Sequence, residues 1–150
     1  MTDSNFRQLS DRFFASPQIG VADIDAAREL GITLIVNNRP EDESSDQPPG
    51  AEIEAAAKAA DIGYLAIPVT HAGFSVPQVE ALAAAIENES ETGKILGFCR
   101  SGTRSTLLWA LARASMGDDP SAISEAAEKA GYDTSPVRPA MDMLAAHKRD

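Results

Sequence analysis

The chain has 150 residues, 43% of them hydrophobic and 24% charged, a composition typical of a soluble globular domain with a sizeable core. Its formal net charge of -10 argues against nucleic acid and anionic membranes as partners, since both are negatively charged. No apolar run approaches the roughly 18 residues of a membrane span, and residues 1–5 lack the pattern of a secretory signal. A single cysteine excludes an internal disulfide, so we expect a cytoplasmic protein.

Short strand-like runs alternate with longer helical ones along the chain. Clusters of β-branched and apolar residues predict a strand and a turn within 12–19, and strands at 32–36, 64–69 and 94–98. Apolar spacing or high alanine content predicts helices at 21–30, 51–61, 77–88, 105–116, 120–130 and 136–147. This alternation, without an internal repeat or a long linker, predicts one α/β domain over residues 1–150, with a mainly parallel central sheet flanked by helices.

The segment from Glu41 to Gly50 is polar and rich in proline, which predicts a mobile loop. It carries four carboxylates, which we interpret as solvated because a metal site would need fixed spacing on a rigid frame: Glu41, Asp42, Glu43 and Asp46. With only two histidines in the chain, we expect no metal site and no cofactor.

The candidate functional loop follows the predicted strand at 94–98 and reads Cys99-Arg100-Ser101-Gly102-Thr103-Arg104-Ser105. Ligands of parallel sheets bind beyond the carboxyl ends of the strands, which is where this loop lies. The backbone N–H groups of residues 100–105 are expected to form an anion-binding ring, with Gly102 allowing the tight turn. The positive end of the next helix and the guanidinium fork of Arg104 add to the attraction for an oxyanion.

Cys99 is the predicted nucleophile, because a helix N-terminus and neighbouring arginines favour the thiolate form of a cysteine. Ser105 is expected to donate a hydrogen bond to the sulfur. A working nucleophile must meet its substrate, so we expect Cys99 to lie at an opening. The alternative, a small buried cysteine at a strand end, does not account for the polar and basic residues that follow it. Arg39, at another strand end, either reaches the same crevice or pairs with acidic residues on the surface.

The chain resembles two families. Cys-Arg-Ser-Gly-x-Arg-Ser is common in single-domain rhodaneses, whereas residues 14–39 resemble the opening of compact dual-specificity phosphatases. Taken together, three segments resemble the phosphatase-like domain of the beta-lactamase-hydrolase-like proteins, a bacterial branch of the Cys-dependent phosphatases: 37–40, 67–69, and 99–105 leading into 108–111. The resemblance covers roughly residues 10–145. It implies Cys99 as nucleophile, Arg104 as oxyanion binder and Ser105 as helper to the sulfur.

Two features depart from the phosphatase pattern. Four residues separate Cys99 from Arg104, one fewer than in such phosphatases and equal to the rhodanese spacing. The upstream Asp that serves those phosphatases as general acid is also missing, since no Asp occurs between Asp61 and Cys99. His71, in the corresponding loop, is a candidate proton donor, although a histidine in a loop is more often simply solvated.

Three functions therefore stay open: a phosphatase acting through a phosphocysteine, a sulfurtransferase carrying sulfane sulfur on Cys99, and a module that only binds anions. The substrate would be a small anionic or phosphorylated molecule, or a persulfide donor with a thiol acceptor. Arg100, Ser101, Gly102, Thr103 and Arg39 are the candidate anion-binding residues. The resemblance also implies a functional link to a persulfide-oxidising metallo-β-lactamase-like protein.

Overall fold

A five-stranded sheet with the order β1-β2-β5-β3-β4 forms the centre of the computed structural model, which describes residues 5–149. Its strands are β1 (Arg7–Ser10), β2 (Phe13–Ser16), β3 (Ile32–Asn37), β4 (Gly63–Ala66) and β5 (Lys94–Phe98). β1 pairs antiparallel with β2, and every other neighbouring pair is parallel. The sheet is therefore mostly parallel, as the alternation of strand and helix predicts.

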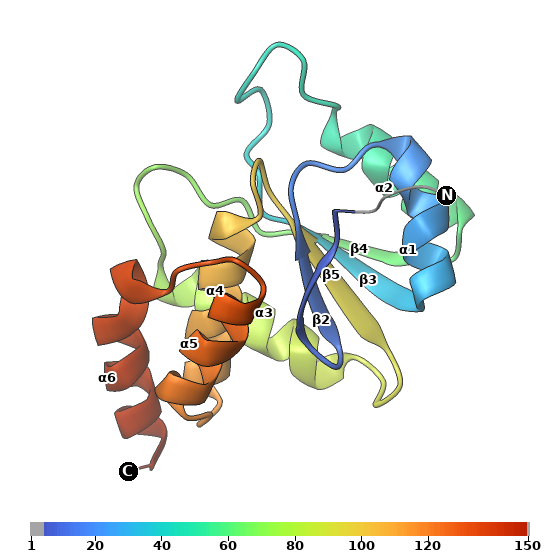
Figure 1. The fold of residues 1–150 in the computed structure, drawn as a ribbon. Coiled ribbons are helices and arrows are strands. Elements are labelled where there is room, and N and C mark those ends of the chain that lie inside the picture. Colours follow the sequence, from blue (N-terminus) through green and yellow to red (C-terminus); the bar gives the residue numbers. More distant parts are fainter. Residues whose placement is uncertain (1–4, 150) are drawn as a thin grey trace.

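Helices cover both faces of the sheet (Figure 1). One face carries α1 (Ile24–Leu30), which follows the short 3-10 helix η1 (Val21–Asp23), and α2 (Gly50–Ala59). The other face carries α3 (Val76–Asn88), α4 (Thr103–Ser115), α5 (Pro120–Lys129) and, after the 3-10 helix η2 (Ser135–Val137), α6 (Arg138–Arg149). None of the helices in residues 5–149 is long and apolar enough to cross a membrane.

The central strands are buried on both faces, which explains their nearly continuous apolar runs. Successive side chains of a strand point to opposite faces. Phe13 accordingly packs in the cluster beneath α3 to α6, while Phe14 packs in the cluster beneath α1 and α2. Val36 and Ile35 of β3 divide in the same way. Both helical layers are thus anchored on the strands that lead to the candidate loop.

The predicted α/β class is confirmed, with one missing strand and shifted boundaries. β1 was not predicted because three of its four residues are exposed and it lacks an apolar run. Of the strand and turn predicted within 12–19, the strand ends at Ser16, because proline follows and has no N–H for the ladder. The strand predicted at 64–69 leaves the ladder after Ala66, although Ile67 and Val69 still donate backbone hydrogen bonds to Asn37 and Asn38.

Truncating Ile35 in β3 should strongly destabilise the protein. Its side chain is completely buried between the central strands and α1 and α2. We expect Ile35→Ala to lower the free energy of unfolding in urea by about 2–5 kcal/mol, through lost burial and the cavity left behind. Met143→Ala is the control, since Met143 is 70% exposed and its loss should cost less than about 0.5 kcal/mol. Equal effects of the two substitutions would contradict this packing.

Candidate active site

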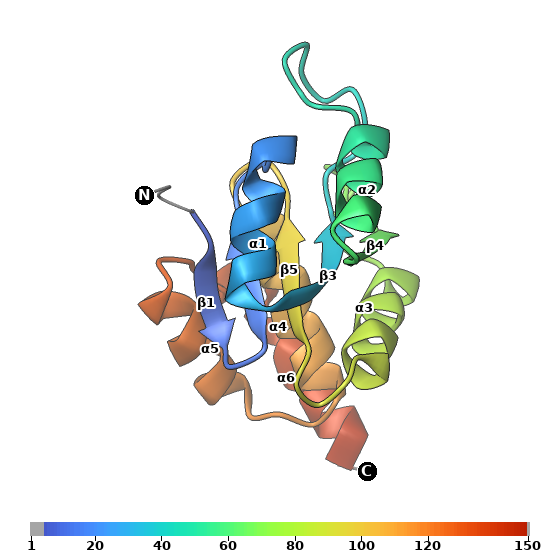
Figure 2. The ribbon, with the colours of Figure 1, turned by 90° about the vertical axis from the view of Figure 1, so that its right-hand side faces the viewer.

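The candidate site lies at the carboxyl end of the parallel strands, where the loops after β2, β3, β4 and β5 meet (Figure 1). Cys99 follows β5 directly, and α4 begins at Thr103. Figure 2 shows the loop between β3 and α2 extending beyond this edge of the sheet. The structure thus brings the loop of residues 99–105 to the edge at which parallel sheets bind their ligands.

The chain turns from β5 into α4 through Gly102, whose φ is 93°. This left-handed conformation is open to glycine and strained for other residues. The turn directs the Gly102 N–H at the sulfur of Cys99, at 3.1 Å. The Gly102 carbonyl accepts hydrogen bonds from the backbone N–H and the hydroxyl of Thr106, at 3.0 and 2.8 Å. One glycine therefore both starts α4 and donates to the predicted nucleophile.

Cys99 is completely buried, with 0% of its surface exposed. This contradicts the expectation that the sulfur lies at an opening. Its backbone N–H donates to the carbonyl of Ser16, and the Gly102 N–H covers the sulfur from the other side. In this conformation, a substrate reaches the sulfur only if a neighbouring group moves.

Arg104 is engaged by a carboxylate that the sequence analysis interpreted as solvated. Its Nη1 and Nη2 donate to the two oxygens of Glu43, at 2.7 and 2.8 Å, and Nη1 also donates to the Val69 carbonyl at 2.7 Å. The hydrogen bond from Arg104 is the main cause that lowers the pKa of Glu43 from 4.5 to about 2. The pKa of Arg104 is raised, first by Glu43 and also by hydrogen bonding and charge from Cys99. The solvated interpretation of Glu43 was therefore wrong.

Arg39 is the second cation of this cluster, and it is buried. Its Nε donates to Glu43 at 3.0 Å, while Nη1 and Nη2 donate to Gln18 and Ser44. Of the two interpretations of Arg39, the structure shows the inward one, with a carboxylate of the 41–50 loop as its partner. The two guanidinium groups and the Glu43 carboxylate form one charge network beside Cys99.

The asparagines before Arg39 explain why this strand end is polar yet buried. Asn38 donates from its side-chain amide to the Ile67 carbonyl at 2.9 Å, and its amide oxygen accepts from the Ser105 hydroxyl at 2.7 Å. The Asn37 side chain accepts from the Arg39 N–H and donates to the Tyr64 hydroxyl. Ser105 therefore donates to Asn38 in this structure, and not to the sulfur as expected, because the asparagine lies directly beside the start of α4.

The remaining predicted residues lie on the surface around the loop. Arg100, Ser101 and Thr103 are exposed, and the Ser101 hydroxyl donates to that of Thr103 at 3.0 Å. His71 is exposed in the loop after β4, two residues beyond the carbonyl that accepts from Arg104. The structure thus brings Cys99, Arg104 and Arg39 into one cluster and leaves His71 at its solvent side.

Tyr132 is a neighbour of the site that the sequence analysis missed. Its hydroxyl donates to the Ser101 carbonyl at 3.3 Å, and burial raises the pKa of this tyrosine. A side chain on Gly102 would collide with the same hydroxyl. No local signal marks Tyr132, because it follows α5, far along the chain from the loop it supports.

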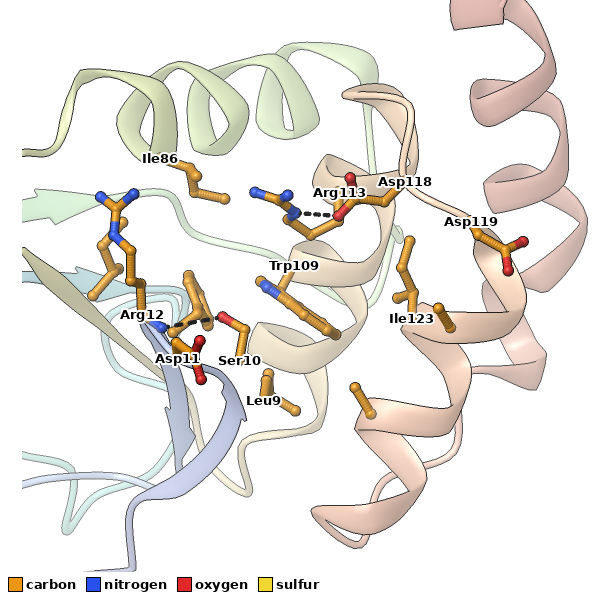
Figure 3. Close-up of a pocket in the computed structure, with 14 residues that line it drawn as sticks. Leu9, Ser10, Asp11, Arg12, Ile86, Trp109, Arg113, Asp118, Asp119 and Ile123 are labelled. Carbon is orange, nitrogen blue, oxygen red and sulfur yellow. Dashed lines mark hydrogen bonds and ion pairs between the residues drawn. The ribbon is translucent and has the colours of Figure 1, made fainter. Parts of the chain in front are cut away.

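A cavity of about 480 Å³ lies at the opposite end of the sheet, beside the turn from β1 to β2 (Figure 3). Trp109 and Phe13 line it, and Cys99 does not. The two arginines at this cavity already have partners: Arg113 pairs with Asp118, and Arg12 donates to backbone carbonyls that include those of Gly93 and Ser90. The predicted nucleophile and the charge network lie away from this cavity, at the loop 99–105.

Comparison with known proteins shows the family of the chain. The chain matches the family described as Beta-lactamase hydrolase-like protein, phosphatase-like domain, over residues 5–116. A Beta-lactamase hydrolase-like protein of Xylella fastidiosa is 30% identical over 103 residues, which are 69% of this chain and 23% of that protein. The chain thus spans about a quarter of the length of the curated relatives it matches.

Solved structures show the same fold. A candidate phosphatase from Neisseria meningitidis is 32% identical, with a TM-score of 0.79 over 92% of this chain and 96% of that one. A variant of P. aeruginosa TpbA, solved in complex with pTyr, is 17% identical, with a TM-score of 0.67 over 97% and 91% of the two chains. Fold and site together define a protein of the phosphatase-like class. The chain belongs to the family of the phosphatase-like domain of Beta-lactamase hydrolase-like proteins.

Replacing Gly102 with alanine should strain the turn and destabilise the folded protein. Its Cβ would collide with the Tyr132 hydroxyl and lie 3.2 Å from the backbone of Ser16, in a left-handed conformation. We expect Gly102→Ala to lower the unfolding free energy in urea by about 1–3 kcal/mol. Gly73→Ala is the matched control, because Gly73 has a similar φ with no atom near the added Cβ. Equal losses in both variants would show that the collision is unimportant.

Because of the ion pairs of Glu43, the free energy of unfolding should depend on pH under acidic conditions. The pKa of Glu43 is about 2 in the folded protein and 4.5 ordinarily, so the ionised carboxylate stabilises the fold fully above about pH 4.5. That contribution is lost as the pH falls through about 2. Urea unfolding of the wild type and Glu43→Gln should show a wild-type advantage that shrinks as the pH is lowered from 6 toward 3. An advantage that stays constant over this range would contradict the ion pair.

Proposed function

We propose that this chain hydrolyses phosphate monoesters, phosphotyrosine among them, with Cys99 as nucleophile. The observation that carries the proposal is the loop after β5, where Gly102 donates to the Cys99 sulfur and Arg104 is the second residue of α4. Membership of a phosphatase-like family supports it. So does the likeness to a protein solved with pTyr, which at this identity concerns the fold alone.

The reaction proceeds in two displacements. The thiolate of Cys99 attacks phosphorus, an S–P bond forms, and the P–O bond to the leaving group breaks with its electron pair on that oxygen, which then takes a proton. Water next attacks the phosphocysteine, the S–P bond breaks, and the thiolate is regenerated as phosphate leaves. One ester and one water thus give one alcohol and one phosphate.

Several of the predicted residues have a role in this scheme. Arg104 and the backbone N–H groups of the loop stabilise the charge on the phosphoryl oxygens. In this proposal His71, which is exposed in the loop after β4, gives the proton to the leaving oxygen. Arg100, Ser101 and Thr103 line the outer wall of the loop and contact the rest of the substrate.

Transfer of sulfane sulfur is a second candidate function, and the short spacing from Cys99 to Arg104 favours it. In that reaction, the thiolate attacks the outer sulfur of thiosulfate, an S–S bond forms on Cys99, and sulfite leaves. Attack by a thiol or by cyanide then removes the sulfur and restores the thiolate. A link to a persulfide-oxidising metallo-β-lactamase-like partner in the cytoplasm would accompany this function.

Two assays on the purified chain separate the candidates. With an aryl phosphate, we expect phosphate release that falls at least about a thousandfold in Cys99→Ser. With thiosulfate and cyanide, we expect no thiocyanate. Thiocyanate production that depends on Cys99 would replace the phosphatase by the sulfurtransferase. Phosphate release that survives the serine substitution would exclude Cys99 as nucleophile, and anion binding without turnover would leave a binding module.

A further inference from the structure

The Arg104 guanidinium is already held by other groups of the protein in this structure. The hydrogen bonds to Glu43 and Val69 use three of the five N–H groups of Arg104. After the hydrogen bond to Glu43, the charge of Cys99 also contributes to the raised pKa of Arg104. Because the sulfur has no exposed surface, an incoming anion must displace one of the groups that now hold Arg104.

Glu43 is the group whose chemistry matches that of a substrate. It presents two oxygens to the two terminal nitrogens of Arg104, the paired geometry in which arginine also binds phosphate. Arg39 donates to the same carboxylate from the other side, so Glu43 lies between two guanidinium groups. The other partner of Arg104 is the Val69 carbonyl. It is less free to move than the Glu43 side chain, because the Val69 N–H donates to the Asn38 carbonyl.

The loop that carries Glu43 is built to stay ordered when this carboxylate leaves. Gln47 accepts from the Glu43 backbone N–H and donates to the Pro40 carbonyl, and Glu41 accepts from the N–H of Gly50 at the start of α2. These bonds close the loop on itself and on α2. They do not involve the Glu43 carboxylate, so its side chain is free to swing away without breaking them.

We propose that Glu43 is an internal competitor of the substrate: its carboxylate occupies the anion position on Arg104, and it must leave before a phosphoryl group reaches Cys99. The inference rests on the proposed function for the identity of the substrate, but it concerns anion binding alone. Only molecules in which Glu43 has left Arg104 can then bind another anion. The apparent affinity for that anion is therefore lowered in proportion to the fraction of such molecules.

Glu43→Gln tests the proposal, because it keeps the shape of the side chain and removes its charge. Asp42→Asn is the matched control. It removes the same charge from the neighbouring exposed position, where the φ of 62° is one that asparagine tolerates. We expect the Kd for inorganic phosphate, measured by titration calorimetry, to fall about tenfold in Glu43→Gln relative to Asp42→Asn. The rate at which the neutral reagent iodoacetamide alkylates Cys99 should rise in the same variant.

Two outcomes would overturn the proposal. A weaker affinity for phosphate in Glu43→Gln would show that Glu43 holds Arg104 in place for the substrate. An affinity equal to that of Asp42→Asn would show that the contact does not compete. If Glu43→Gln does not fold, carbon NMR of the Glu43 carboxyl in the wild type serves instead. Saturating phosphate should then raise its pKa from about 2 toward 4.5, and an unchanged pKa would contradict displacement.

These measurements do not depend on turnover. Tighter phosphate binding in Glu43→Gln would support the competitor even if no phosphate ester is hydrolysed. Hydrolysis by the wild type together with unchanged binding in the variant would overturn the competitor and leave the phosphatase in place.

Discussion

The left-handed turn at Gly102 is the constraint on which the site depends. It reverses the chain from the central strand β5 into the buried helix α4 within a few residues, and in doing so directs a backbone N–H at the Cys99 sulfur. The same residue packs against Tyr132 and the end of β2, which leaves no space for a side chain. Strand, turn and helix are each held by the core, so the loop keeps its shape without a bound ligand.

The second determinant is an ion-pair network of two arginines and one glutamate that are far apart in the sequence. Arg104 comes from the start of α4, Arg39 from the end of β3, and Glu43 from the loop before α2. A buried guanidinium without a partner is costly, so Arg39, which is buried, and Arg104, which is partly buried, need a counter-ion. The Glu43 carboxylate supplies it in this structure, and in the proposed reaction the phosphoryl group would supply it instead. In that proposal, the same two cations account for the contact with Glu43 and for the attraction of an anionic substrate.

The sequence could predict the parts of this arrangement that are local. A mainly apolar run followed by Cys99, Gly102 and Arg104 within six residues indicates a strand, a turn and an anion-binding helix start. The order of strands and helices indicates the α/β class in the same way. Ser105 was assigned the wrong partner because its true one, Asn38, is 67 residues away in the chain.

The long-range contacts were beyond such reasoning. Glu43 and Arg104 are 61 residues apart in the sequence. The loop between β3 and α2 has the composition of a solvated segment, so its sequence does not show which carboxylate points inward. β1 was missed for a related reason, since an exposed antiparallel edge strand needs no apolar run. Periodicity reports which residues face the core, whereas ion pairs between loops depend on where the folded chain brings them.

The covalent role of Cys99 is the central claim, and trapping the intermediate tests it most directly. The wild-type chain would be mixed with an aryl phosphate, quenched in acid during turnover, and digested for mass spectrometry of the peptide that contains Cys99. The account predicts one phosphoryl group on the Cys99 sulfur. Turnover with an unmodified Cys99 peptide, or with the phosphoryl group on another residue, would contradict it.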